Sequence, residues 1–453
     1  MKKFSSNHLL LLVLGILGLA FLAMPAFAQD AAKMQELQRV IDAQKRENDA
    51  QQKQLEAQQK QLDAQRQLLQ DLQKQMQSLV KDADTEEVPV AAEKPATKPA
   101  VASTKAPPPD KKVVTSGGGE RVKLAISGWV NQMVNIVDDG KDTDAYFVDN
   151  DNAESRVNFA GTAKVTDDLT LGSMIELTIA PNLAGTVSQV DQQNNNIFDQ
   201  RIVEATLDSK RFGKLSLGKG YSAAYGSASR DLSRTEVISY ATVSDTAGGM
   251  LFRQTDDDTL TDITIADAFQ SFDGLNRQNR VRYDTPTYHG FHLSAAAVSD
   301  ERYDAALWWG GQGYGFKAIG AVGLADPNKD DTGLQYDGSF SLLHEDTGLN
   351  LTLSSGLQER DNQSDAGNLY GKLGWLTRFF SFGETAFEVD YTRTRNQPTE
   401  NDDGYSVGAS AVQIFEEYGT DIYLLYRLYS LDRDVEPSVQ DINLVSIGAR
   451  VKF

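Results

Sequence analysis

The sequence predicts an all-β fold, a transmembrane barrel of about 16 antiparallel strands, preceded by an α-helical coiled coil and a disordered tether. The first observation is an alternation of apolar and polar residues from about residue 120 onward. Leu124, Ile126 and Val130 share one parity, and Lys123 and Ser127 hold the other. The second observation is that such segments recur as far as the C-terminus. The third is that no run of roughly 20 apolar residues, the length of a membrane-crossing helix, follows residue 30.

The composition agrees with this fold and excludes other classes of protein. The 453 residues are 40% hydrophobic and have a mean hydropathy of −0.41, because a barrel that alternates apolar and polar residues dilutes its own membrane signal. The chain has no cysteine, which excludes disulfides and thiolate metal sites. A formal net charge of −20, without a basic stripe, argues against nucleic-acid binding.

Residues 1–28 have the three parts of a signal peptide. Lys2 and Lys3 provide the positive charge, residues 9–21 the apolar core, and Ala26 and Ala28 the small residues of a cleavage site. An uncleaved membrane anchor is the alternative, but the apolar core is short for a membrane span. We therefore expect the chain to be exported.

Residues 29–82 are predicted to form a periplasmic coiled coil. The stretch is rich in Gln and, from residue 31 on, has neither Gly nor Pro. The second core position of its heptad is Gln in four consecutive layers, so a solvated single helix is the alternative. Self-association is the preferred interpretation, because polar layers help to fix register and strand number. The first core position of the heptad is held by Met34, Ile41, Asn48, Leu55, Leu62, Leu69 and Met76.

Residues 83–119 are expected to be a tether. The stretch is rich in Pro, Ala and Lys and ends in three consecutive glycines at 117–119. Such a composition cannot bury a core and favours extended conformations. It marks the boundary before the barrel domain, residues 120–453.

Within the barrel domain, one stretch is too long for an ordinary connection between strands. Residues 221–275 show little alternation, and a connection of that length in a compact domain is usually functional. In the strand that follows, Arg280 and Arg282 share one parity, and Val281 and Tyr283 the other. We expect the long connection to fold into the barrel and the two arginines to line the pore that it narrows.

No group of residues indicates catalysis, a metal or a cofactor. GKLSLGK at 213–219 has Gly220 where a phosphate-binding loop requires Ser or Thr, and its alternating leucines indicate a strand. His289, His292 and His344 are the histidines that follow the signal peptide, and no cysteine completes a metal site with them. An enzymatic function is therefore not expected.

Three stretches resemble the Gram-negative outer-membrane trimeric porins. RIVEATLDSKRFGKLSLGKG (201–220) and NRVRYDTPTYHGF (279–291) are similar to strands that flank the constriction of sixteen-stranded porins. The final strand, LVSIGARVKF (444–453), ends on Phe453 and resembles the insertion signal read by the barrel assembly machinery. The leader of coiled coil and tether is most like the DcaP-like branch, porins associated with dicarboxylate uptake. The resemblance covers essentially the whole mature chain.

The resemblance implies a homotrimer in the outer membrane, in contact with lipid and lipopolysaccharide, through which small hydrophilic solutes diffuse passively. Residues 221–275 then correspond to the third loop, which narrows the channel in this family. The basic side of the constriction is assigned to Arg280 and Arg282, and parity adds Arg156 and Arg427. The acidic side, on the loop, is assigned to Asp256, Asp257, Asp258 and Asp262.

Three functions stay open at this point. Arginines facing loop acids would create a transverse field that favours anionic, especially dicarboxylic, solutes. The loop acids favour the alternative of a general or cation-preferring porin. A barrel that anchors a structural coiled coil is the third. The arginines have an alternative role too, which is to pair with loop carboxylates and hold the loop in place.

Overall fold

The structure, a computed structural model, describes residues 112–114, 122–193, 198–329 and 331–453. The expected signal peptide (1–28), the coiled coil (29–82) with its heptad residues, and most of the tether (83–119) lie outside the described residues. In the part of the chain that the structure describes, no helix is long and apolar enough to cross a membrane.

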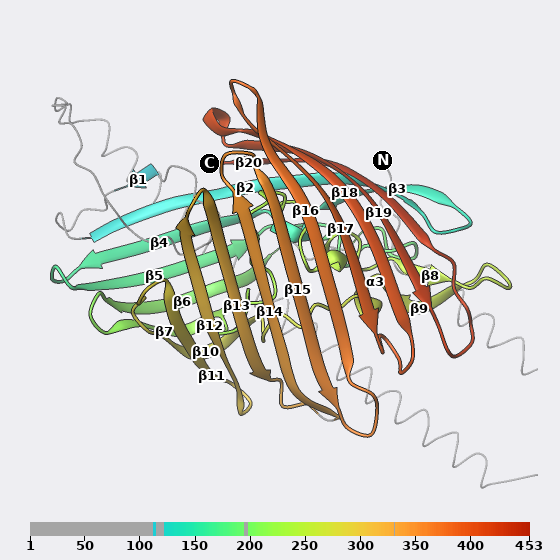
Figure 1. The fold of residues 1–453 in the computed structure, drawn as a ribbon, viewed down its shortest axis with the longest axis horizontal. Coiled ribbons are helices and arrows are strands. Elements are labelled where there is room, and N and C mark those ends of the chain that lie inside the picture. The colour runs from blue at the N-terminus through green and yellow to red at the C-terminus, as the bar shows by residue number, and fades with distance from the viewer. Residues whose placement is uncertain (1–111, 115–121, 194–197, 330) are drawn as a thin grey trace, which may run out of the picture. The chain divides into compact units, whose positions relative to one another are not determined.

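The described residues form a closed antiparallel barrel of 16 strands (Figure 1). Each strand pairs with its neighbours along the chain, and the first barrel strand pairs with the last to close the cylinder. The predicted barrel and its strand number are confirmed. The strands are β2 (Val122–Asp138), β4 (Arg156–Lys164), β5 (Leu169–Thr178), β6 (Asp199–Ser209), β7 (Gly213–Tyr221), β10 (Arg277–Asp284), β11 (Phe291–Val298), β12 (Arg302–Gly313), β13 (Phe316–Asp326), β14 (Thr332–His344), β15 (Leu349–Arg360), β16 (Ala366–Phe380), β17 (Gly383–Arg395), β18 (Asp403–Phe415), β19 (Thr420–Asp432) and β20 (Ile442–Lys452).

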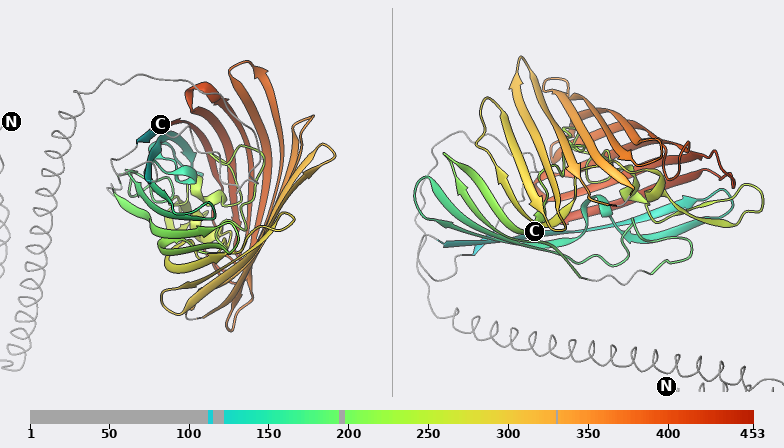
Figure 2. Two further views of the ribbon diagram at one scale, coloured as in Figure 1. Left: turned by 90° about the vertical axis from the view of Figure 1, so that its left-hand side faces the viewer. Right: turned by 90° about the horizontal axis from the view of Figure 1, so that it is seen from below.

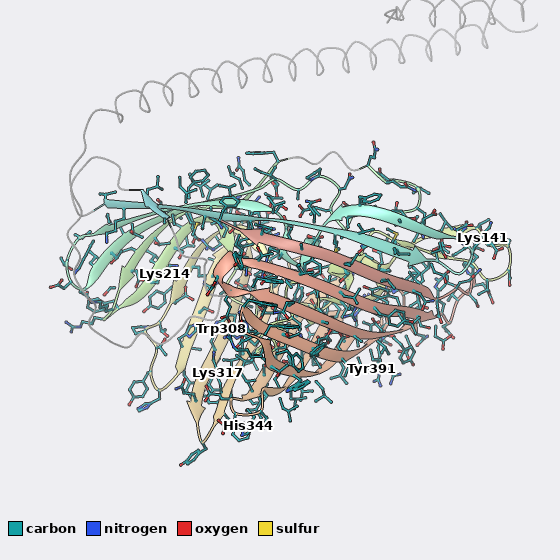
Figure 3. All side chains as sticks on the ribbon, turned by 90° about the horizontal axis from the view of Figure 1, so that it is seen from above. Lys141, Lys214, Trp308, Lys317, His344 and Tyr391 are labelled. Atoms are coloured by element: carbon teal, nitrogen blue, oxygen red, sulfur yellow. The ribbon has the colours of Figure 1, made fainter. Side chains whose placement is uncertain are left out.

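The alternation of residues along each strand determines which side chains face out. In β19, Ile422 and Leu424 are exposed, whereas Tyr423 and Leu425 between them are buried. Because successive side chains of a strand point to opposite faces, one parity forms an apolar outer surface and the other faces the interior. Short connections gather at the end of the barrel marked by Lys214, Lys317 and His344, and most of the longer ones at the end marked by Lys141 (Figure 3).

The seam between the first and last strands carries two strands that the alternation did not predict. β20 covers the second half of β2, and the C-terminal residue Phe453 exchanges two backbone hydrogen bonds of 3.0 Å with Gly128. β1 (Lys112–Val114), inside the expected tether, pairs with the start of β2. β3 (Thr143–Asp149) pairs with its end. β2 therefore pairs along its whole length.

The long connection between β7 and β10, residues 222–276, folds into the interior of the barrel (Figure 2). We call it the inner loop. It contains the 3-10 helix η2 (Val243–Thr246), the hairpin of β8 (Leu251–Arg253) and β9 (Leu260–Thr264), and the short helix α3 (Ile265–Ala268). A capping box formed by Thr264 and Asp267 begins α3. Two further 3-10 helices lie outside the loop: η1 (Asp151–Ala153) and η3 (Glu416–Tyr418).

An apolar core fixes the inner loop to one side of the barrel. From the loop, Phe252 and Phe269 join a buried cluster that also contains the wall residues Tyr370, Tyr423 and Tyr429. The rings of Phe269 and Tyr429 meet edge to face, 5.4 Å between centroids. Full burial of a large apolar side chain stabilises a fold by about 1.5–3 kcal/mol. The inner loop is therefore packed against the inward faces of β16–β20 and β2.

Candidate functional site

The inner loop begins with its backbone bound to carboxylates of the wall. The N–H groups of Ala223 and Ala224 donate to the Asp304 carboxylate of β12, at 2.9 and 2.8 Å. The hydroxyl of Ser227 donates to Asp337 of β14. Both carboxylates are buried, and buried charges need such partners. The first turn of the loop is thus held against β12 and β14.

A buried lysine holds the next segment of the loop. The ammonium of Lys372, on β16, forms an ion pair with Asp231 and donates to the hydroxyls of Ser233 and Thr235, at 3.0 and 2.9 Å. Lys372 is 1% exposed. All of these partners belong to the inner loop, so the cation serves to attach the loop and does not meet solutes.

Arg427 has a similar position on β19, three strands after β16. Its guanidinium donates two hydrogen bonds of 2.7 Å to Asp390 and one of 3.0 Å to the hydroxyl of Ser239, in the inner loop. Arg427 is 0% exposed. It faces inward but lies beneath the loop, whereas the sequence led us to expect it on the pore surface. Parity along a strand cannot reveal what covers the inward face.

The part of the loop around η2 follows the same side of the barrel. Tyr429 donates its hydroxyl hydrogen to the carbonyl of Val243 at 2.7 Å. The side-chain amide of Asn135, on β2, donates to the carbonyl of Thr246 at 2.7 Å. These bonds and the apolar core hold one face of the loop against the wall from β12 to β20 and β2. Its other face is turned toward β4, β5 and β6.

On that second wall, arginines and glutamates form a buried network. Arg156 donates to the carboxylate of Glu176 at 3.1 Å, and Arg201 donates to the same oxygen at 2.8 Å. Arg201 also forms an ion pair with Glu154. Arg156, predicted from parity, therefore faces inward beside an arginine that the sequence reasoning missed.

A β-bulge in β6 explains why alternation does not predict the orientation of Arg201. Gln200 and Ile202 pair with consecutive residues of β5, so Arg201 between them is an extra residue of β6. A bulge redirects a side chain. By strict alternation Arg201 would share the outward face of Val203, which is 41% exposed. The broken register turns it inward instead.

Beside this network lies a group of half-buried side chains at the root of the inner loop. The rings of Tyr221 and Tyr225 are stacked, with 5.0 Å between centroids and an interplanar angle of 4°. The guanidinium carbon of Arg277, the first residue of β10, lies 6.0 Å from the centroid of the Tyr221 ring. Arg277 also approaches Glu154, at 3.8 Å between nitrogen and oxygen.

Three half-buried carboxylates lie near these arginines in connections between strands, and one of them, Asp273, accepts hydrogen bonds from the N–H groups of Gly226 and Ala228 within the inner loop. Asp245 and Asp273 belong to the inner loop and Asp151 to η1. Asp245 accepts a hydrogen bond from the hydroxyl of Tyr240 and lies within electrostatic reach of Arg277 and Arg201. Burial, and next the charge of Asp245, raise the pKa of Asp151 to about 7. Burial raises the pKa of Asp245 and of Asp273 to about 6.

Arg280 and Arg282, expected to line the pore, follow Arg277 along β10. Arg280 is 6% exposed, forms an ion pair with Glu204 and donates to the carbonyl of Tyr221 at 2.8 Å. Arg282 donates to Asp284 and to the carbonyl of Ser222, each at 2.6 Å. Both arginines face inward, whereas Val281 and Tyr283 are exposed on the outer face. Their bonds to the carbonyls of Tyr221 and Ser222 hold the start of the inner loop, but their carboxylate partners belong to the wall strands β6 and β10 and not to the loop, unlike the alternative role expected for them.

The acids expected on the loop are not brought together with these arginines. Asp256, Asp257 and Asp258 form the exposed tip of the β8–β9 hairpin. That hairpin contacts the connection between β19 and β20, where Gln440 donates to Asp258 at 2.8 Å. Asp262, on β9, is exposed as well. Asp245 and Asp273 are single aspartates in weakly charged stretches, so no local pattern marks them, whereas Asp151 stands in an acidic stretch with Asp149 and Glu154.

Comparisons with known proteins agree with this architecture. A family model for Gram-negative porins matches residues 92–450. An anion-selective porin from Comamonas acidovorans has a similar structure, with a TM-score of 0.53 and 14% identity, over 73% of this chain and 100% of that one. OmpT of Vibrio cholerae has a TM-score of 0.50 and 12% identity, over 76% and 100%. The DcaP channel of Acinetobacter baumannii has a TM-score of 0.48 and 12% identity, over 74% and 99%. A search of curated protein sequences found no match.

Proposed function

Because the chain belongs to the Gram-negative porin family, we propose that it is an outer-membrane channel for the passive diffusion of small hydrophilic solutes, narrowed by its inner loop. We define the constriction as the half-buried group of Tyr221, Tyr225, Arg277, Asp151, Asp245 and Asp273, together with Arg201 behind it.

The observation that carries this proposal is the separation of charge across the constriction. Arg201 and Arg277 belong to strands of the wall, whereas Asp245 and Asp273 belong to the inner loop. Opposite charges on two sides of a narrow aqueous passage create a transverse field, which orients dipolar solutes. The packing of the loop against β16–β20 and β2 supports the same proposal, because it holds the face with Asp245 toward the arginines of the second wall.

The first candidate for selectivity is a preference for anionic solutes, dicarboxylates among them. Its support is a series of inward-facing arginines on the wall from β4 to β10. Guanidinium groups bind carboxylates with two parallel hydrogen bonds, which gives geometric specificity as well as affinity. The series consists of Arg156, Arg201, Arg277, Arg280 and Arg282.

The second candidate is a preference for cations, and a specific observation favours it. Among the described residues, Asp151, Asp245 and Asp273 form no ion pair, whereas Arg156 and Arg201 are paired with buried glutamates. Carboxylates without a paired cation leave a net negative field at the constriction.

The sign of the zero-current potential in a potassium chloride gradient distinguishes the two candidates. The full-length protein is reconstituted in planar bilayers and compared with Arg277→Gln and with Asp245→Asn. We expect the first substitution to shift selectivity toward cations and the second toward anions. Arg211→Gln is the matched control, because Arg211 is exposed on the short turn between β6 and β7. A protein that forms no conducting channels would disprove the proposed function, and selectivity unaffected by either substitution would place the constriction elsewhere.

A further inference from the structure

We propose that the constriction binds zwitterionic solutes, with free α-amino acids as the chemical class, an inference that rests on the proposed channel function. An amino acid carries an ammonium and a carboxylate on one carbon atom. The constriction offers acceptors for the first group and donors for the second, and both are accessible within the same half-buried group.

The acceptor side consists of Asp151 and Asp245. Asp151 forms no hydrogen bond and no ion pair with any described residue, although it is half-buried. Asp245 has the hydroxyl of Tyr240 as its hydrogen-bond partner in the described chain. A carboxylate has about four acceptor positions on its two oxygens, so both groups have unused capacity. An ammonium with its three N–H donors would use it.

The donor side is Arg277. The guanidinium groups of Arg156 and Arg201 are ion-paired with Glu176 and Glu154. Arg277, by contrast, has a side chain that is 20% exposed and a nearest carboxylate oxygen at 3.8 Å, beyond hydrogen-bond distance. Its guanidinium group is therefore available to bind the carboxylate of a solute.

A zwitterion fits this arrangement better than a solute of either single charge. A simple anion held by Arg277 would be repelled by Asp151 and Asp245, and a simple cation held by the carboxylates would be repelled by Arg277. A zwitterion satisfies both sides at once. The stacked rings of Tyr221 and Tyr225 add an aromatic surface beside the donor, against which a side chain with a ring can pack.

A matched set of ring-bearing probes tests the proposal. Phenylalanine carries both charges, phenethylamine only the ammonium, and 3-phenylpropanoate only the carboxylate. Each is titrated onto single channels of the full-length protein at about pH 8, where all the groups involved keep their charges. The measured quantity is the concentration that halves the potassium chloride conductance. We expect this concentration to be at least about tenfold lower for phenylalanine than for either analogue, because each lost charge leaves one side of the site unsatisfied.

Variants assign the two charges to the two sides. Arg277→Gln is expected to make phenylalanine no better a blocker than phenethylamine, and Arg277→Lys to restore part of the difference. Asp151→Asn with Asp245→Asn is expected to make phenylalanine no better a blocker than 3-phenylpropanoate. Arg211→Gln and Asp257→Asn, at exposed positions away from the constriction, are the matched controls for charge removal.

Conductance tests the channel function, and block by the three probes tests the zwitterion site. Potassium chloride conductance close to that of the unsubstituted protein establishes that a variant has folded and still conducts. If either singly charged analogue blocks as well as phenylalanine, or if none of the three blocks, the zwitterion site is disproved while the channel stands. Loss of all conductance in the unsubstituted protein would overturn the proposed function itself.

Discussion

The two halves of the barrel interior have the same alternating pattern and opposite roles. Under the inner loop, Lys372 and Arg427 are buried, and each is paired with a carboxylate. Across from it, Arg277 and Asp245 are half-buried and face each other without forming an ion pair. An inward-facing charge therefore has a structural role where a second layer covers it, and it is available to solutes where no such layer lies over it. The predictions that follow alter one half at a time.

The largest effect is expected from Arg427→Met. This substitution leaves Asp390 buried without its cation, which costs about 3–5 kcal/mol. The free energy of unfolding in detergent should fall by that amount, and single-channel recordings should become noisy as the middle of the inner loop detaches. Arg427→Met with Asp390→Leu is the control, because removing both charges restores much of the stability. Unchanged stability in the single variant would mean that the pair does not hold the loop.

A smaller effect is expected from Tyr429→Phe. The variant keeps the ring against Phe269 and removes the hydrogen bond to the carbonyl of Val243. A buried carbonyl without its donor costs about 1–3 kcal/mol. Denaturant unfolding measures the loss, and Tyr391→Phe, whose ring is exposed on the outer face of β17, provides the comparison (Figure 3). A loss as large in the control as in Tyr429→Phe would refute the assignment.

Acidification tests the carboxylates that face the second wall. The pKa values of Asp151, Asp245 and Asp273 are raised to about 7, 6 and 6, so these carboxylates take up protons as the pH falls through that range, well above the usual range for aspartate. Loss of negative charge opposite Arg277 should shift the zero-current potential toward anion selectivity between about pH 8 and about pH 5. Asp245→Asn with Asp273→Asn should shrink the shift. A shift toward cations on acidification would contradict the assignment.

The smallest effect is expected from Asp257→Asn. Asp257 is exposed at the tip of the β8–β9 hairpin and bonds to the neighbouring Thr259. Because it lies outside both halves of the interior, neither the zero-current potential nor the unfolding midpoint should change measurably. A change in selectivity similar to that of Asp245→Asn would instead restore the hairpin acids to the constriction.

The barrel could be predicted because its determinants are local. Alternation over about ten residues reports which face of a strand meets lipid, and it located the strands from β2 to β20. The strands it missed have other causes. β1 and β3 exist because β2 is longer than its barrel neighbours and offers its free edges for pairing. Nothing in the short segments themselves requires them to be strands.

The constriction could not be predicted in the same way. Arg201 faces inward because of a bulge, which shifts parity without a signal in the sequence. Asp245 faces the second wall because the loop around it is held by partners far away in the chain, such as Asn135, 111 residues from Thr246. The richest cluster of acids, Asp256 to Asp258, was the natural choice from local composition. Distant contacts, which no short window contains, placed the functional acids instead.

The seam at β2 and β20 has a consequence for how the cylinder forms. The bond between Asn135 and Ser446 joins residues 311 positions apart, so closure of this seam closes a very long loop and cannot occur before the C-terminus has been made. A chain shortened by its final strand would contain every residue of the constriction and yet expose the unpaired edge of β2 to other chains. Truncated protein should therefore aggregate instead of forming channels, although it contains every residue of the constriction.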